Sequence, residues 1–221
     1  TVAVGEGVRE LVLRVSGDAA GFHGTVLGLG FRPVVRTPRL PAGIAASAIA
    51  QALEAAEAPE LPVVYGRHRL GVFRIGLAGD DPAAVADVND DPITLVEPAF
   101  RGSMIDLFGI GGGKSLTGQA SETFGQLFLI PGDGRTPARL TTTALGGFPD
   151  AALDFALRPG GYRLSARIPL AALKIAVADG EFAFTAAIYT HVAGVEDTLR
   201  ASLFGQRSLN DPHAYARMRV V

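Results

Sequence analysis

Apolar and polar positions alternate along most of the chain after Pro59, and this alternation predicts β-strands. Successive side chains of a strand point to opposite faces, so an apolar residue at every second position marks one buried face. The clearest segment is YRLSARI at residues 162–168, where aromatic and aliphatic side chains alternate with arginine and serine. Other strands are predicted at residues 61–65, 70–77, 93–96, 124–130, 138–144, 151–157, 182–189, 199–204 and 215–221.

The pattern before Pro59 differs. Residues 8–15 and 25–31 are predicted to form a hairpin, and residues 32–41, which include three prolines, an extended connector. Residues 44–57, IAASAIAQALEAAE, are predicted to form a helix, because alanine dominates and the larger apolar side chains fall on one side. Pro59 ends this helix.

Many short strands with a single helix predict an all-β fold. We expect a two-sheet antiparallel β-sandwich of the jelly-roll or immunoglobulin-like kind, with one short early helix. Residues 40–221 are predicted to form this sandwich, and residues 1–39 to add strands and a connector that pack on it.

The composition narrows the possible functions. Charged residues make up 19% of the 221 residues and the net charge is −2, which argues against a nucleic-acid partner. No apolar run is long enough to span a membrane. The absence of cysteine excludes disulfides and a catalytic thiol. The chain begins at Thr1, so we expect a processed or trimmed sequence, in which a missing signal peptide is uninformative.

The segment RGSMIDLFGIGGG at residues 101–113 is predicted to be the central strand, running into a glycine loop. Alternation places Ile105 and Leu107 on one face, and Met104, Asp106 and Phe108 on the other. A face that holds a thioether, a carboxylate and an aromatic ring is either a second packed layer or a binding surface.

Several segments, taken in order, resemble family 9 carbohydrate-binding modules and their DOMON-like relatives. They are LPVVYGRHRLGVFRIGLAGDD, RGSMIDLF, GQLFLIPGDG, GGYRLSARIPLAAL, EFAFTAAIYTHVAG and LNDPHAYARMRVV. The closest match is Gly-Gly-Tyr followed by an alternating strand and Ile-Pro. The resemblance covers about residues 40–221.

The resemblance implies a non-catalytic, saccharide-binding module that is accessory to an enzyme or a surface complex and lies outside the cytoplasm. Phe100 falls where the family has a sugar-stacking tryptophan, and Asp106 where it has a sugar-contacting carboxylate. The chain has no tryptophan, and Phe128 replaces an expected arginine. The implied ligand-binding residues are Phe100, Asp106, Phe108, Gln126 and Tyr189. The alternative is a structural or protein-interaction domain with a degenerate sugar site, whose partner is a protein.

Residues 79–92, GDDPAAVADVNDDP, are predicted to be an acidic, turn-rich loop. Closely spaced carboxylates are the oxygen ligands that calcium prefers. Asp80, Asp81, Asp87 and Asp90 are therefore candidate calcium ligands. The alternative is a solvated turn in which the aspartates favour turn geometry.

Met104 and His191 support a second alternative function. Some DOMON-like sandwiches bind haem b between a methionine on one strand and a histidine on a later one, and both side chains are suitable axial ligands. This alternative predicts an electron-transfer domain. Otherwise Met104 fills a gap in a packed layer and His191 is a loop residue.

Other chemistries find little support, and we expect a protein that is not an enzyme. The loop GIGGGKSLTG misses the spacing of a phosphate-binding loop by one residue, and the four histidines lack zinc-site spacing. No Gly-x-Ser-x-Gly elbow is present. A glycosidase pair would need Asp106 together with Glu97 or Glu122, whose positions in space the sequence does not define.

Overall fold

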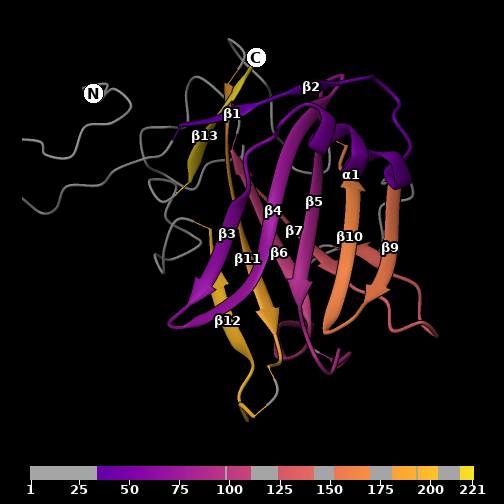
Figure 1. Cartoon of the computed structure of the whole chain (residues 1–221), viewed down its shortest axis with the longest axis vertical. Coiled ribbons are helices and arrows are strands. Elements are labelled where there is room, and N and C mark those ends of the chain that lie inside the picture. Colours follow the sequence, from indigo (N-terminus) through magenta and orange to yellow (C-terminus); the bar gives the residue numbers. More distant parts are fainter. Residues whose placement is uncertain are drawn as a thin grey trace, which may run out of the picture. The chain divides into compact units, whose positions relative to one another are not determined.

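The computed structural model arranges thirteen strands, one α-helix and one short 3-10 helix within the described part of the chain (Figure 1). The predicted hairpin of residues 8–15 and 25–31 and the glycine loop after Ile110 lie outside that part. The structure describes residues 34–97, 99–110, 124–141, 152–169, 181–192, 194–203 and 215–221.

The first sheet has seven strands in the order β1-β13-β11-β6-β7-β8, with β12 paired to β11. Strand β6 (Met104–Ile110) lies between β11 (Glu181–Thr190) and β7 (Phe124–Ile130) and is antiparallel to both. The predicted central strand is thus confirmed as an interior strand. The other members are β1 (Val34–Thr37), β8 (Arg139–Thr141), β12 (Leu199–Ser202) and β13 (Ala216–Val220).

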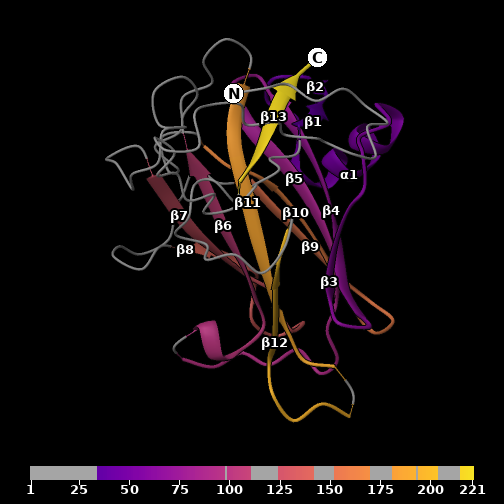
Figure 2. The same cartoon turned by 90° about the vertical axis from the view of Figure 1, so that its left-hand side faces the viewer.

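The second sheet has six strands in the order β2-β4-β5-β10-β9, with β3 paired to β4. Figure 2 shows the two sheets as separate layers, with helix α1 on the outer side of the six-stranded sheet. The strands are β2 (Arg39–Leu40), β3 (Leu61–Tyr65), β4 (His68–Ala78), β5 (Asp81–Asn89), β9 (Ala152–Arg158) and β10 (Gly161–Arg167).

The predicted all-β sandwich is confirmed, with two differences in strand pairing. Strand β1 runs parallel to β13, and β2 runs parallel to β4, so both sheets are mixed. Both strands come from the proline-rich segment predicted as a connector. Pro38 lies between them and has no N–H to donate, and the chain passes there from one sheet to the other. The sandwich therefore includes residues before the boundary predicted at residue 40.

A continuous apolar core fills the space between the sheets. From β6 it takes Ile105 and Leu107, both fully buried, and from β4 Phe73 and Ile75. Burying such side chains stabilises the fold by about 1.5–3 kcal/mol each before the loss of chain entropy is counted. The inner faces of both sheets are thereby committed to packing, and a ligand site must lie at an edge or on an outer face.

Helix α1 (Ala46–Ala55) lies within the predicted range of residues 44–57. Ile49 and Leu53 are four residues apart, so they share one face of the helix. Both are fully buried in a second apolar cluster that includes Ala83 and Val85 of β5. The helix therefore covers part of the outer face of the six-stranded sheet.

The prediction of an acidic loop at residues 79–92 is wrong, because residues Asp81–Asn89 form strand β5. This strand is buried on both faces: Ala84 and Ala86 face the main core, while Ala83 and Val85 lie under α1. A strand covered on both sides loses the alternation that marks a half-buried one. The short strand predicted at residues 93–96 is also absent, since these residues are irregular.

Replacing Leu53 with alanine should lower the free energy of unfolding by about 2–5 kcal/mol, since it removes a fully buried side chain and leaves a cavity under α1. Gln51→Ala, at an exposed position of the same helix, should change it by no more than about 0.5 kcal/mol. Urea unfolding of the two variants measures the difference. Equal stabilities would mean that α1 is not packed on the sheet.

Candidate functional site

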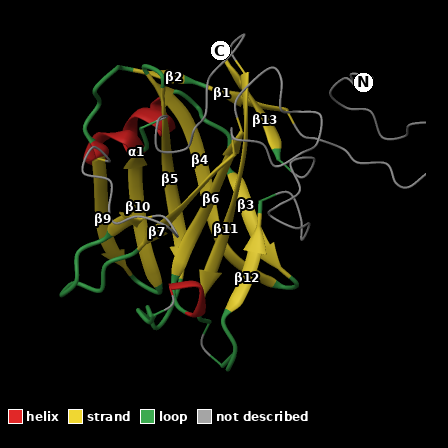
Figure 3. Cartoon of the chain, turned by 180° about the vertical axis from the view of Figure 1, so that it is seen from behind, coloured by secondary structure: helices red, strands yellow, loops and turns green. Residues whose placement is uncertain are grey.

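Strand β6 presents two chemically different faces, as its alternation predicts. Ile105 and Leu107 belong to the main core, whereas Met104 belongs to a separate cluster on the opposite side of the sheet. Asp106, which alternates with Ile105 and Leu107, lies on the side of Met104. We call this side of the seven-stranded sheet the outer face; Figure 3 shows the molecule from behind, with β6, β7 and β11 in view.

The outer face is a packed layer around Met104. The Met104 side chain is fully buried in a cluster with Tyr189 and Tyr215, and Phe128 packs against it. Ala183 and Ala187 of β11 and Ala99 also belong to this layer. Phe128, at the position of the expected arginine, therefore contributes apolar packing instead of hydrogen-bond donors.

Asp106 and Gln126 form the polar centre of the outer face. The Gln126 amide Nε2 donates to both carboxylate oxygens of Asp106, at 3.1 and 3.2 Å. The Asp106 side chain is only 3% exposed, and this burial raises its pKa to about 7 despite the hydrogen bond from Gln126 and the attraction of Arg200. A carboxyl group in this state can accept or donate hydrogen bonds near neutral pH.

Tyr189 and Arg200 lie on the same face. They are direct partners in the pairing of β11 with β12, and the Arg200 guanidinium carbon is 5.1 Å from the centre of the Tyr189 ring. Arg200 was not among the predicted site residues. Its position between Leu199 and Ala201, both buried, was the available signal, because alternation places it on the opposite side from these two. An arginine thus reaches the outer face from β12 instead of β7.

A pocket of about 210 Å³ opens beside the 3-10 helix η1 (Ala99–Arg101). Its apolar lining includes Ile130, which lies on the same face of β7 as Gln126 and Phe128 because the three are spaced two residues apart, so the pocket adjoins the outer face. Its lining residues are Leu95, Val96, Glu97, Ala99, Ser103, Ile130, Thr136 and Arg139. Of the candidate glycosidase residues, Glu97 pairs with Arg139 at 3.0 Å, and Glu122 lies outside the described residues.

The fold therefore brings together some of the predicted saccharide-binding residues. Asp106, Gln126 and Tyr189 share the outer face. Phe100 falls in η1, next to Ala99 of the pocket, and Phe108 falls in β6. The structure describes the backbone of these two phenylalanines but not their side chains.

Met104 and His191, the candidate haem ligands, take part in separate networks. Met104 is enclosed by the apolar cluster described above. The His191 Nε2 is 3.1 Å from the Thr198 hydroxyl, and its backbone N–H donates to the buried Asp90 carboxylate at 2.7 Å. Burial raises the pKa of Asp90, and hydrogen bonds from His191, Ser103 and Thr190 oppose this rise. These contacts favour structural roles for Met104 and His191.

The four candidate calcium ligands are not grouped as a metal site. Asp87 pairs with Arg163 at 2.8 Å, and Asp81 pairs with Arg167 at 2.9 Å. Asp90 is buried beside His191, and Asp80 lies in the turn before β5. Among the described residues, no group of three or more histidine, aspartate or glutamate side chains is placed to hold a metal ion. The calcium prediction rested on a loop at residues 79–92, and residues 81–89 of that segment form strand β5.

The described strands form a two-sheet β-sandwich whose outer face carries the Asp106–Gln126 pair and the Tyr189–Arg200 pair. No family model and no curated protein matches the sequence. The chain is similar in structure to a family 9 carbohydrate-binding module from Caldicellulosiruptor kristjanssonii in complex with cellotriose. The TM-score is 0.64 and the identity 13%, over 85% of this chain and 93% of that one.

Two further structures agree. A family 9 module from the same organism in complex with glucose has a TM-score of 0.54 at 14% identity, covering 74% of this chain and 82% of that one. A candidate carbohydrate-binding protein from Bacteroides uniformis has a TM-score of 0.57 at 9% identity, covering 86% of this chain and 100% of that one. The chain therefore has the fold of family 9 carbohydrate-binding modules, as the sequence resemblance implied. The DOMON-like part of that resemblance finds no support here.

The substitution Asp106→Asn should alter how stability depends on pH. The pKa of Asp106 is higher in the folded than in the unfolded state, so the folded state binds more protons between pH of about 4 and about 7. The free energy of unfolding of the native protein should therefore fall as the pH rises through this range. The asparagine variant should lack the part of this fall that comes from Asp106 and, relative to the native protein, gain at most about 4 kcal/mol above neutral pH. Denaturant unfolding across pH measures this, and identical profiles for both proteins would contradict it.

Proposed function

We propose that this protein is a non-catalytic module that binds a saccharide on the outer face of the seven-stranded sheet. The observation that carries the proposal is the juxtaposition of the hydrogen-bonded Asp106–Gln126 pair with the stacked Tyr189–Arg200 pair on one face. Both pairs combine polar groups with an apolar surround, which is the chemistry that a sugar ring requires.

Each pair has a separate part in binding. Gln126 directs its amide N–H toward Asp106, so its carbonyl oxygen remains to accept a hydrogen bond from a sugar hydroxyl. Arg200 is exposed and supplies donors. Asp106 is too buried to contact a ligand broadly, and its main part is to orient Gln126. The pocket beside η1 adds apolar surface from Val96 and Ile130 against which a ring can pack.

Two features support a binding role over a catalytic one. The described carboxylates of the face are engaged by Gln126 and Arg139, not paired with each other. Two of the similar structures were determined with cellotriose and with glucose bound.

In the described part of the chain no helix is both long and apolar enough to span a membrane. We place the module outside the cytoplasm, as an accessory to an enzyme or a surface complex.

Calorimetric titration with neutral oligosaccharides, cellotriose among them, tests the proposal. We expect weak binding, with a dissociation constant on the order of micromolar to millimolar, because the face offers little apolar area and few donors. Gln126→Ala should weaken binding by about 3- to 10-fold, the worth of one hydrogen bond. Gln51→Ala, which removes an exposed amide from α1 on the other sheet, is the matched control and should bind normally. If no sugar gave a heat of binding, the proposal would be contradicted and the protein-interaction domain would remain.

A further inference from the structure

Arg200 differs in its contacts from the arginines that form ion pairs in the described part of the chain. Its guanidinium lies over the Tyr189 ring, and within the described residues it forms no ion pair. Six other arginines do lie within ion-pair distance of a carboxylate: Arg69, Arg74, Arg139, Arg158, Arg163 and Arg167.

The Tyr189 ring fixes the position of this guanidinium. Tyr189 is only 9% exposed and belongs to the Met104 cluster, so its ring is held by packing. A cation held over such a ring keeps its N–H donors directed outward, and arginine presents them as a planar fork. That fork matches the two oxygens of a carboxylate in geometry and charge.

Arg200 also ends a row of residues that crosses the sheet. Arg200 pairs with Tyr189, which pairs with Met104 of β6. Ile105 pairs with Leu129, so Met104 and Ile130 come next to each other, and Ile130 pairs with Arg139 of β8. Five strands span about 19 Å at the usual spacing. The row therefore carries an arginine at each end and apolar side chains between them, with the pocket at its Arg139 end.

The carboxylates near this row do not satisfy Arg200. The Asp106 carboxyl attracts Arg200 without forming an ion pair, and Gln126 already occupies both its oxygens. Glu97 is bound to Arg139 at the far end of the row. An incoming carboxylate at Arg200 would thus meet an available cation and would break no described ion pair there.

We propose that the saccharide bound by this face is acidic, a chain that contains a uronic acid, and that Arg200 binds its carboxylate. This inference rests on the proposed saccharide binding and names the class of sugar. The neutral sugar units of this saccharide lie along the row toward the pocket, where Ile130 and Val96 supply apolar contact.

The test compares two trisaccharides of the same linkage, one of neutral glucose and one that carries a glucuronate. Calorimetry at low salt should show the uronate trisaccharide binding about tenfold more tightly or better, since hydrogen bonds to charged groups are stronger than neutral ones. Arg200→Gln should remove this preference, so that the variant binds both trisaccharides with the same affinity, and it should weaken binding of the neutral trisaccharide by no more than about 3- to 10-fold, the worth of one hydrogen bond. Arg200→Lys should restore only part of it, because lysine keeps the charge but loses the fork.

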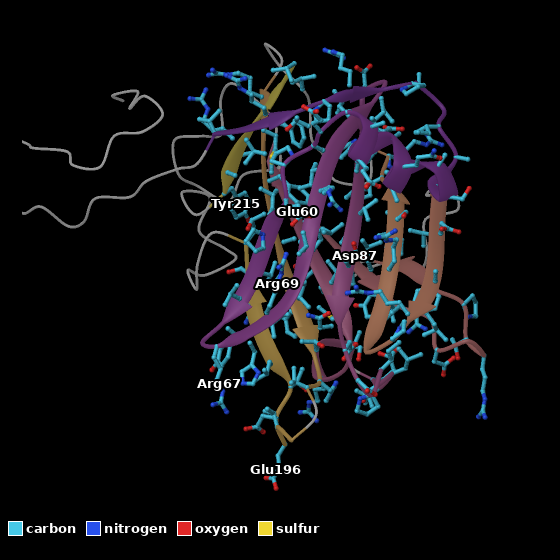
Figure 4. All side chains as sticks on the ribbon, in the orientation of Figure 1. Glu60, Arg67, Arg69, Asp87, Glu196 and Tyr215 are labelled. Carbon is cyan, nitrogen blue, oxygen red and sulfur yellow. The ribbon has the colours of Figure 1, made fainter. Side chains whose placement is uncertain are left out.

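Arg67→Gln is the matched control. It removes the same charge at the turn between β3 and β4 of the six-stranded sheet, where Figure 4 labels Arg67. This variant should keep the preference for the uronate. Equal binding of both trisaccharides by the native protein would overturn the inference and leave the proposed function standing. A preference that survives in Arg200→Gln would overturn the assignment of Arg200. Failure to bind either trisaccharide would overturn both proposals.

Discussion

Strand β6 must bury both of its faces, and the candidate site follows from this constraint. On one face Ile105 and Leu107 join the core between the sheets, and on the other Met104 is enclosed by its own apolar cluster. Asp106 lies on the same face as Met104, and its carboxylate is almost fully withdrawn from water. A buried carboxylate needs a partner, and Gln126 supplies it from the neighbouring strand.

Because β6 buries both of its faces, the side chains of the outer face divide into those that hold the face in shape and those that can contact a ligand. Met104, Asp106 and Phe128 are occupied by packing or by hydrogen bonds, so they hold the face in shape. Among the described polar side chains of this face, Gln126 and the exposed Arg200 remain accessible to the proposed ligand. The family resemblance anticipated a tryptophan clamp and an arginine on β7. Here the arginine comes from β12, on the opposite side of β6, and lies over a tyrosine.

The fold was largely predictable from the sequence, because half-buried strands such as β10 alternate cleanly and α1 is rich in alanine. Strand β5 was missed because it is covered on both sides and its aspartates suggested a loop. The pairing of Asp106 with Gln126 depends on the register between β6 and β7, which the sequence does not determine. Arg200 was overlooked for a similar reason, since its neighbour Tyr189 becomes known only from the pairing of β12 with β11.

The central claim is that the outer face of the seven-stranded sheet binds a saccharide. The most direct measurement is a nuclear magnetic resonance titration of the isotope-labelled protein with an oligosaccharide. The account predicts that the Gln126 side-chain amide and the backbone amides of Tyr189 and Arg200 shift progressively and saturably. The backbone amides of β5 and β10, on the other sheet, should keep their chemical shifts. Shifts confined to the six-stranded sheet, or none anywhere at saturating sugar, would contradict it.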